Sequence, residues 1–280
     1  MTVRIVTDST ADLLPETAAE LGVSVVPLSV VFGEESLREG IDISHDLFYD
    51  RLVRSKDLPT TSAPSVGEFI TAYEEVLKET DEIVSIHLSA KMSVTCDNAT
   101  QAARHLSDSG AKIEVIDSGF LSQGIAFLVS AAARAAANGA TVEEIRQIID
   151  DMIPRVHLFI VFDTLEYVRR GGRIGRARAF LGSVLKVKPL LAIRDGEFVP
   201  EERIRTKKKV MEKLYQIATS YPNVAKFGIA YSTNPHKAEE LRQKLASGVS
   251  GVQIEISRLG PVLGVHGGPG VLGLGVLQGE

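Results

Sequence analysis

Short runs of branched apolar residues recur along the first half of the chain, separated by amphipathic or polar segments. Runs of this kind are typical of buried strands. The predicted strands are Val3–Asp8, Ser24–Phe32, Glu82–Leu88 and Lys112–Asp117. Most of them are followed by helix-like segments, and this alternation favours a mainly parallel sheet with helices on its faces.

Two of the amphipathic segments begin with a helix-start signal. Ser65 is followed three residues later by Glu68, and Thr141 is followed in the same way by Glu144. A hydroxyl residue and a glutamate at this spacing can bond each other's backbone N–H groups as a capping box. We therefore expect helices to begin just after Ser65 and Thr141.

The pattern restarts after Pro154 and gains a hairpin signal, because Asp195-Gly196 suits a two-residue turn between paired strands. The remaining predicted elements are strands at His157–Asp163, Lys188–Arg203 (with that turn), Lys226–Ser232 and Val252–Ser257, and helices at Thr206–Ser220 and Pro235–Ala246. We therefore predict a two-domain α/β protein, with a parallel α/β domain over residues 1–155 and a smaller mixed α/β domain over residues 156–280. Clefts between domains are favoured ligand sites.

Composition narrows the classes of function. The chain has 280 residues, 44% of them hydrophobic, and carries 31 Lys and Arg against 36 Asp and Glu, a net charge of -5. No global positive field attracts nucleic acid, so a basic patch acts locally. The lone Cys96 excludes an internal disulfide and fits a reducing compartment. No signal-peptide pattern and no apolar run of about 20 residues occurs, so we expect a cytoplasmic protein.

Three hydroxyl-rich segments lie where an open sheet binds ligands. They are "TTSAPS" at 60–65, "SAKMSVT" at 89–95 and "DSGFLSQG" at 117–124. We expect them to be loops, and one hydroxyl in each serves as an ordinary helix cap. Thr61 and Ser93 are additional hydroxyls that the helix caps do not require. Hydroxyls beside helix N-terminal amides can hold an anion.

The tail "HGGPGVLGLG" contains a formal dinucleotide-binding spacing at Gly268, Gly270 and Gly273. That fingerprint needs a following helix and an acidic residue about 20 positions later, and the tail offers neither. His266, just before these glycines, is a candidate for holding a small anion beside exposed N–H groups. The alternative is a packed histidine on a terminal strand.

Other chemistries find little support. There is no G-x-S-x-G nucleophile elbow, no Walker A sequence, and no histidine spacing typical of a metal site. We therefore expect no metal and no cofactor.

Six motifs together resemble the DegV family of fatty-acid-binding proteins, which includes the acyl-binding subunit of bacterial fatty acid kinase. In chain order they are "VTDSTADLL" from Val6, "TSAPS" from Thr61, "LSAKMSVT" from Leu88, "IDS" from Ile116, "TLEYVRRGGRI" from Thr164 and "GPVLGVHGGPG" from Gly260. The match runs from end to end of the chain.

This resemblance implies a non-catalytic, lipid-binding protein that buries one long acyl chain. Its carboxylate would be held by Thr61, Ser93 and His266, with possible support from three neighbours: Ser62, Thr95 and Gly267. Two positions depart from the family pattern, since Val94 replaces a glycine and Gly267 replaces a threonine.

The resemblance also implies a partner, an ATP-dependent kinase that converts the presented carboxylate to an acyl phosphate. Arg169, Arg170 and Arg173 flank Gly171-Gly172, and they are expected to face that kinase or its phosphoryl group; Arg176 and Arg178 fit an exposed helix face. A carrier of membrane lipid would also make transient membrane contact, whereas nucleic acid is not expected as a partner.

Two other functions remain open. One is an enzyme that acts on a small anion through His266 and Ser93. The other is a regulatory protein whose fold the lipid stabilises.

Overall fold

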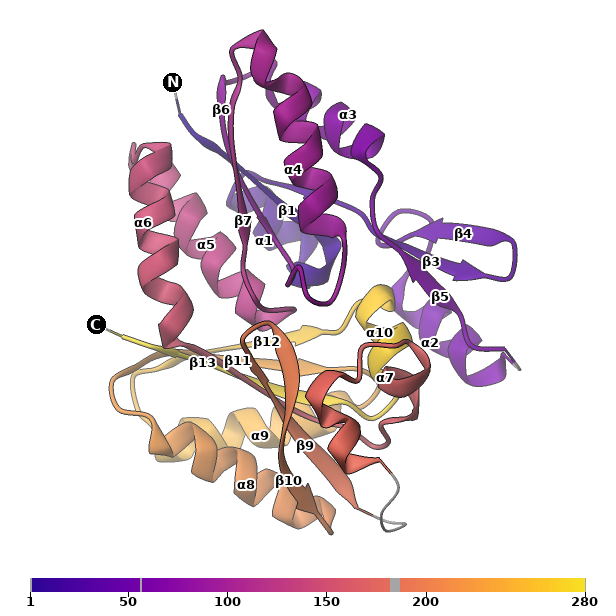
Figure 1. Cartoon of the computed structure of the whole chain (residues 1–280). Helices are drawn as coiled ribbons and strands as arrows, with labels where there is room; N and C mark the ends of the chain where they lie inside the picture. Colours follow the sequence, from indigo (N-terminus) through magenta and orange to yellow (C-terminus); the bar gives the residue numbers. More distant parts are fainter. Residues whose placement is uncertain (1, 56, 182–186, 280) are drawn as a thin grey trace.

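The computed structural model describes residues 2–55, 57–181 and 187–279. Its first half is built on a four-stranded parallel sheet in the order β2-β1-β6-β7 (Figure 1). The strands are β1 (Arg4–Asp8), β2 (Val23–Val26), β6 (Glu82–His87) and β7 (Lys112–Asp117). The parallel sheet predicted from the alternating pattern is confirmed.

Helices cover both faces of this sheet. Val6 and Ile83 pack under one pair of helices, whereas Ile5 and Val84, their neighbours in the two strands, pack under the other pair. The first pair is α3 (Val66–Val76) and α4 (Thr95–Leu106), the second is α5 (Gln123–Ala137) and α6 (Val142–Met152), and the short α1 (Pro15–Glu20) leads into β2. Both predicted capping boxes are present, at the starts of α3 and α6.

The predicted strand Ser24–Phe32 is wrong as a single element. Pro27 has no backbone N–H to continue the ladder, and the chain leaves the parallel sheet there. It resumes as β3 (Ser29–Phe32), which pairs antiparallel with β4 (Glu35–Arg38) and β5 (Thr60–Ser62) in a small separate sheet beside α2 (His45–Arg54). The first half of the first hydroxyl-rich segment, Thr60–Ser62, is therefore an edge strand, whereas residues 63–65 form a loop as we expected.

The second half is built on a six-stranded mixed sheet in the order β10-β9-β8-β13-β11-β12. Its strands are β8 (Val156–Val161), β9 (Lys188–Arg194), β10 (Glu197–Ile204), β11 (Val224–Tyr231), β12 (Gln253–Arg258) and β13 (Leu272–Gln278). The predicted hairpin is confirmed: Asp195 and Gly196 both have positive φ angles and join β9 to β10. The mixed α/β class is confirmed as well.

Two long helices, α8 (Lys207–Ser220) and α9 (Pro235–Gly248), pack on one face of the six-stranded sheet. Two short helices lie near the small sheet, α7 (Glu166–Arg170) and α10 (Pro261–Gly267), and a 3₁₀ segment, η4 (Gly175–Phe180), follows α7. The domain boundary that we predicted near Arg155 falls between the 3₁₀ segment η3 (Ile153–Arg155) and β8, and it stays a prediction.

The helix α5 lies between the two large sheets (Figure 1). It contacts β1 and β6 of the parallel sheet and β8, β11 and β13 of the mixed sheet. Most of its residues are buried, because "IAFLVSAAARAAA" is apolar on nearly every side. One hydrophobic core thus joins the two halves of the chain.

Candidate functional site

An apolar cavity lies between the two halves, at the end of the shared core. About 790 Å³ of space beside its lining residues is unoccupied by atoms, a volume that includes open solvent. On β8 the residues alternate between faces, so that Leu158 and Ile160 line the cavity while Phe159 and Val161 pack under α8 and α9. The cavity is therefore part of the core left unfilled.

The floor of the cavity is made by small residues of the mixed sheet. Ala230 on β11 and Gly273 on β13 are direct partners across the ladder, and both line the cavity. Two residues further along, Gly228 pairs with Gly275, but there the side chain of Gln123 covers Gly228, and Phe127 and Gln123 cover Gly275. These two side chains therefore end the floor in that direction.

One end of the cavity is polar and opens into a wider cleft. Thr61, Ser93 and Arg173 line both the cavity and the cleft, and His266 lines the cavity. The cleft continues past the exposed Ser62 and Lys91 towards Glu197. Thr61, Ser93, Arg173 and His266 therefore meet at one mouth, although they come from four segments of the chain. The other predicted residues Thr95, Arg169 and Arg170 line neither the cavity nor the cleft.

Thr61 and His266 form a direct pair at this mouth. Thr61 Oγ1 and His266 Nε2 are 3.0 Å apart, while His266 Nδ1 is buried and has no hydrogen-bond partner among the described residues. Burial, and to a smaller extent the charge of Arg173, lowers the pKa of His266 to about 4. The imidazole is therefore neutral at pH 7 and can polarise a hydroxyl without adding a charge.

His266 lies in the last turn of α10, so the alternative of a histidine on a terminal strand is wrong. The tail turns at Gly268 and Gly270, both with positive φ, before β13 begins. A Cβ at Gly171 would lie 2.2 Å from His266 Nδ1, and one at Gly268 would lie 2.3 Å from the ring of Tyr167. These glycines allow α7 and the tail to pack closely and hold the imidazole in place.

Ser93 occupies the turn between β6 and α4. Its Oγ lies 2.9 Å from Thr95 Oγ1 and accepts a hydrogen bond from Thr95 N at 3.3 Å. Val94 has φ of -80°, which any residue adopts, so the glycine usual at this position is not needed for the turn. Gly267 lines the cavity, and Ser62 Oγ donates to Ala63 O at 3.2 Å.

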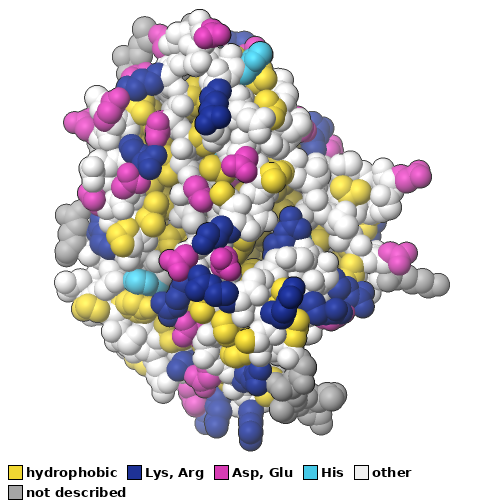
Figure 2. All heavy atoms as spheres, in the orientation of Figure 1, with side chains coloured by type: hydrophobic (Ala, Val, Ile, Leu, Met, Phe, Trp, Pro, Cys, Tyr) yellow, Lys and Arg dark blue, Asp and Glu magenta, His cyan; other side chains and the backbone are white. Residues whose placement is uncertain are grey.

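The three arginines predicted to face a partner differ in their contacts. Arg173 reaches the mouth, where its guanidinium donates to Met92 O at 3.1 Å and Gly171 O at 2.7 Å. Arg169 and Arg170 both bond Glu166, whose pKa these hydrogen bonds lower to about 2. Figure 2 shows Lys and Arg gathered across the middle of this face, over α7 and the tip of the β9–β10 hairpin.

Arg176 and Arg178, which fit an exposed helix face in the sequence, lie on the 3₁₀ segment η4 rather than on an α-helix. Arg176 is exposed, and its guanidinium lies 3.2 Å from the carboxylate of Asp195 and 3.7 Å from that of Glu197, at the tip of the hairpin. Exposed pairs of this kind contribute little to stability.

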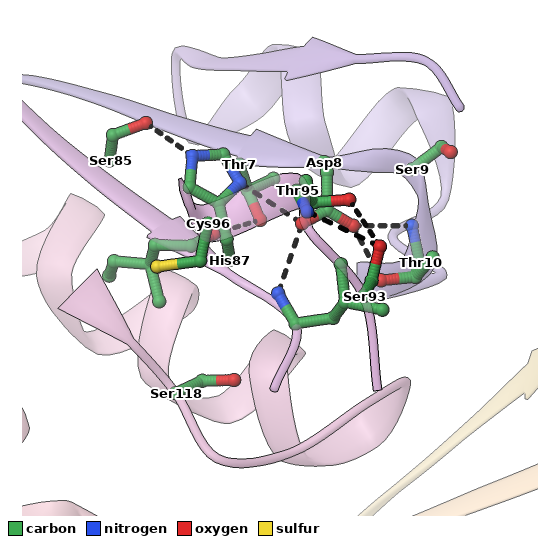
Figure 3. A network of polar contacts seen from close by, with 12 residues as sticks. Thr7, Asp8, Ser9, Thr10, Ser85, His87, Ser93, Thr95, Cys96 and Ser118 are labelled. Carbon is green, nitrogen blue, oxygen red and sulfur yellow. Dashed lines mark hydrogen bonds and ion pairs between the residues drawn. The ribbon is translucent and has the colours of Figure 1, made fainter. Parts of the chain in front are cut away.

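A buried polar network below the mouth was not foreseen from the sequence (Figure 3). Asp8 Oδ2 lies 3.0 Å from His87 Nδ1 and accepts from Leu88 N, while His87 Nε2 lies 2.7 Å from Ser85 Oγ. Asp8, His87 and Ser85 are completely buried and do not line the cavity. The order Asp–His–Ser resembles a catalytic triad, but here all three side chains are buried away from the cavity, and the bonds from Asp8 to His87 and Leu88 N join β1 to β6.

Among the described residues, no group of three or more His, Cys, Asp and Glu side chains is placed to hold a metal ion. In the same part of the chain, no helix is both long enough and apolar enough to span a bilayer.

Comparison with known proteins identifies close relatives over the whole chain. The family model described as an uncharacterised protein of the DegV family matches residues 2–279. A DegV domain-containing protein of Halalkalibacterium halodurans is 40% identical over 276 residues, which is 97% of each chain.

Two solved structures share the fold. One, a DegV family protein from Thermus thermophilus described as binding fatty acid, has a TM-score of 0.93 at 30% identity and covers 99% of this chain and 100% of its own. The other, a stearic acid-binding protein from Eubacterium ventriosum, has a TM-score of 0.91 at 29% identity and covers 99% of this chain and 98% of its own.

The neutral imidazole predicts an acid-dependent loss of stability. Because the pKa of His266 is lowered from 6.5 to about 4, the unfolded chain binds the proton first, and the free energy of unfolding falls as the pH drops from about 6.5 towards 4. We expect His266→Gln to remove a slope of up to ~1.4 kcal/mol per pH unit below pH 6, measured by urea unfolding. The exposed His105→Gln variant is the control, and equal slopes in wild type and His266→Gln would contradict the assignment.

Proposed function

The chain belongs to the DegV family, and we propose that it binds one long-chain fatty acid, with the acyl chain in the apolar cavity and the carboxylate at the polar mouth. The observation that carries this proposal is the cavity itself, which is apolar inside and has its polar side chains at one end. That distribution matches the shape of a fatty acid. The related proteins described as fatty-acid-binding support the same ligand.

The energetics favour such a ligand. Burial of about 14 methylene groups at ~0.8 kcal/mol each gives a gross gain on the order of 10 kcal/mol, which exceeds the cost of ordering a flexible chain. The carboxylate must keep hydrogen-bond donors when it leaves water. The hydroxyls of Thr61 and Ser93 would supply them.

The Thr61–His266 pair suggests how the carboxylate is held. When Nε2 carries the imidazole proton, it donates to Thr61 Oγ1, and the threonine hydroxyl hydrogen is then free to point at the carboxylate. Because the imidazole is neutral, the carboxylate keeps its full negative charge. A carboxylate bound in this way remains nucleophilic towards a phosphoryl donor.

We further propose that the protein presents this carboxylate to an ATP-dependent kinase and does not itself catalyse the reaction. The cleft beside the mouth would give the kinase access, and the basic turn that holds Arg169, Arg170 and Arg173 would steer an acidic partner. The acyl chain would stay sheltered throughout. A regulatory protein stabilised by lipid would bind the same ligand without passing it on.

The contacts of Ser93 argue against the small-anion enzyme. In a nucleophilic mechanism Ser93 would bond His266 as its base. The hydroxyl of Ser93 is instead bonded to Thr95, and His266 is bonded to Thr61. A binding role fits these contacts better.

The ligand assignment predicts a stoichiometric lipid. Mass spectrometry of the denatured protein should find about one long-chain fatty acid per chain, and Thr61→Val should weaken fatty acid affinity by roughly 10- to 100-fold because the carboxylate loses a donor. Thr71→Val is the matched control, since Thr71 bonds Gly67 O on the exposed side of α3. Unaltered affinity in Thr61→Val would refute the head-group site.

Because Gln123 limits the floor of the cavity, its substitution should change the preferred length of the bound acyl chain. Gln123→Ala should open the space above Gly228 and shift the bound fatty acids towards longer chains by roughly two methylene groups, because the long side chain no longer fills it. Gln123→Met keeps the volume and serves as the control. The readout is the chain-length distribution by mass spectrometry, and identical distributions for Ala and Met would contradict the prediction.

The proposed handover is tested with a purified ATP-dependent fatty acid kinase. Arg170→Glu should slow association about tenfold at low salt, with the difference fading at high salt, while fatty acid content stays the same. Lys208→Glu on α8 makes the same charge change on the far side of the mixed sheet. If acyl phosphate forms equally with both variants, the arginine turn is not the docking surface; if no acyl phosphate forms with wild type, the regulatory alternative is favoured.

A further inference from the structure

Two buried carboxyl groups hold the first turn of α10. Asp12 Oδ1 accepts a hydrogen bond from Gly260 N at 2.8 Å, and Glu39 Oε1 accepts one from Val262 N at 3.0 Å. Asp12 follows the 3₁₀ segment η1 (Ser9–Ala11), and Glu39 follows β4, so both come from the first forty residues. The helix that carries His266 is therefore attached by its N-terminal end to the other half of the chain.

The two carboxyl groups converge on a single glycine. A Cβ at Gly260 would lie 2.1 Å from Glu39 Oε1 and 3.2 Å from Asp12 Oδ1, so no side chain fits between them. The second oxygen of Glu39, Oε2, is buried and has no hydrogen-bond partner among the described residues. A buried carboxylate oxygen without a donor is costly, and two neighbouring carboxylates do not both ionise readily. This arrangement favours a pair that keeps a proton.

The electrostatic surroundings agree with a retained proton. Burial, with a smaller contribution from neighbouring carboxylates, raises the pKa of Asp12 to about 7 and that of Glu39 to about 8. The charged and titratable groups that face the pair are Asp8 from β1, Tyr49 from α2 and, behind the ring of Tyr49, Arg258 from β12. Arg258 itself is bonded to Asp46, so it does not neutralise the pair.

The pair is also connected to the wall of the cavity. Ser122 lines the cavity, and its hydroxyl donates to Asp12 Oδ2. Its backbone has φ of 49° and ψ of -126°, a conformation that costs free energy for a residue other than glycine. From Gly260 the seven-residue helix α10 runs straight to His266, at a rise of ~1.5 Å per residue. A shift of the carboxyl pair would therefore move both the cavity wall and the imidazole.

We propose that Asp12 and Glu39 are positioning residues for the head-group site: through their bonds to Gly260 N and Val262 N, these buried carboxyl groups fix the first turn of α10 and thereby set His266 against Thr61. This inference rests on the proposed function, because it assigns to that site a control by pH. At pH 6 the pair holds a proton and α10 is held in place. When both groups ionise at higher pH, they repel each other, the first turn of α10 loosens and the Thr61–His266 pair separates.

The raised pKa values of Asp12 and Glu39 determine how stability changes with pH. Both pKa values lie above those of an unfolded carboxyl group, so the folded state binds the extra proton. The stabilising contribution is complete below about pH 4 and is lost as the pH rises to about 8. Fatty acid affinity should fall over the upper part of that window, where His266 is already neutral and does not titrate.

The test is a pH profile of fatty acid affinity from pH 6 to 9, measured by displacement of a fluorescent fatty acid. We expect the affinity of wild type to fall about tenfold over this range, the equivalent of one pKa unit of coupling. Glu39→Gln keeps an oxygen for Val262 N and has no charge to develop, so its affinity at pH 9 should be no weaker than at pH 6. Glu35→Gln, an exposed glutamate on β4 that pairs with Arg51, is the matched control and should follow wild type.

A second measurement tests the positioning of His266 without relying on fatty acid binding. The NMR signal of the His266 imidazole in wild type should shift between pH 6 and 9, above its own titration, and should not shift in Glu39→Gln. Wild type and Glu39→Gln with the same affinity profile and the same imidazole signal would overturn the inference. If no fatty acid binds while the imidazole signal still depends on Glu39, the proposed function fails and the positioning of His266 stands.

Discussion

The structure depends on one buried helix that serves two sheets. The apolar faces of the parallel sheet and of the mixed sheet both need cover, and α5 supplies it to each. A single helix about 10 Å wide does not cover a six-stranded sheet. α5 covers only part of β8, β11 and β13, and the rest of their surface, at Ile160, Ala230 and Gly273, lines the cavity. The loops at the ends of the parallel strands close it. Binding space thus arises from incomplete coverage of a core.

The polar groups at the mouth follow from the same arrangement. Loops at the carboxyl ends of parallel strands gather at one edge, and Ser93 comes from such a loop. The small antiparallel sheet brings Thr61 to this edge, and α10 brings His266. Burial then keeps the imidazole neutral, so the mouth offers donors that are polar without being cationic, apart from Arg173 at its rim. A fatty acid carboxylate held by the hydroxyls of Thr61 and Ser93, as we propose, would keep its negative charge.

Local signals explain what could be predicted from the sequence. Capping boxes at Ser65 and Thr141 and the turn at Asp195-Gly196 depend on residues a few positions apart, and all three are present. The prediction of one strand over Ser24–Phe32 fails because apolar alternation continues through Pro27 although the chain changes sheets there. The family motifs brought together Thr61, Ser93 and His266, which no local pattern connects.

The parts that escaped prediction depend on contacts between distant segments. The bond of Asp8 to His87 spans 79 positions, and those of Glu39 and Asp12 to the start of α10 span more than 200. From the sequence, Asp8, Asp12 and Glu39 look like ordinary surface residues. Nothing in the neighbouring sequence indicates that they are buried. The sequence of α5 is apolar throughout, and this does not indicate that the helix packs between two sheets.

The packing of β13 has a consequence for the proposed ligand site. Gly273 faces the cavity, whereas Leu272, Leu274 and Val276 face a separate, filled core under α8 and α9. On its other side β13 also contacts α5, but most of its apolar side chains lie in the core under α8 and α9, so an empty cavity would change few of its packing contacts. The mixed sheet therefore forms a wall whose packing does not depend on a bound fatty acid, and we expect the protein to stay folded when the cavity is empty.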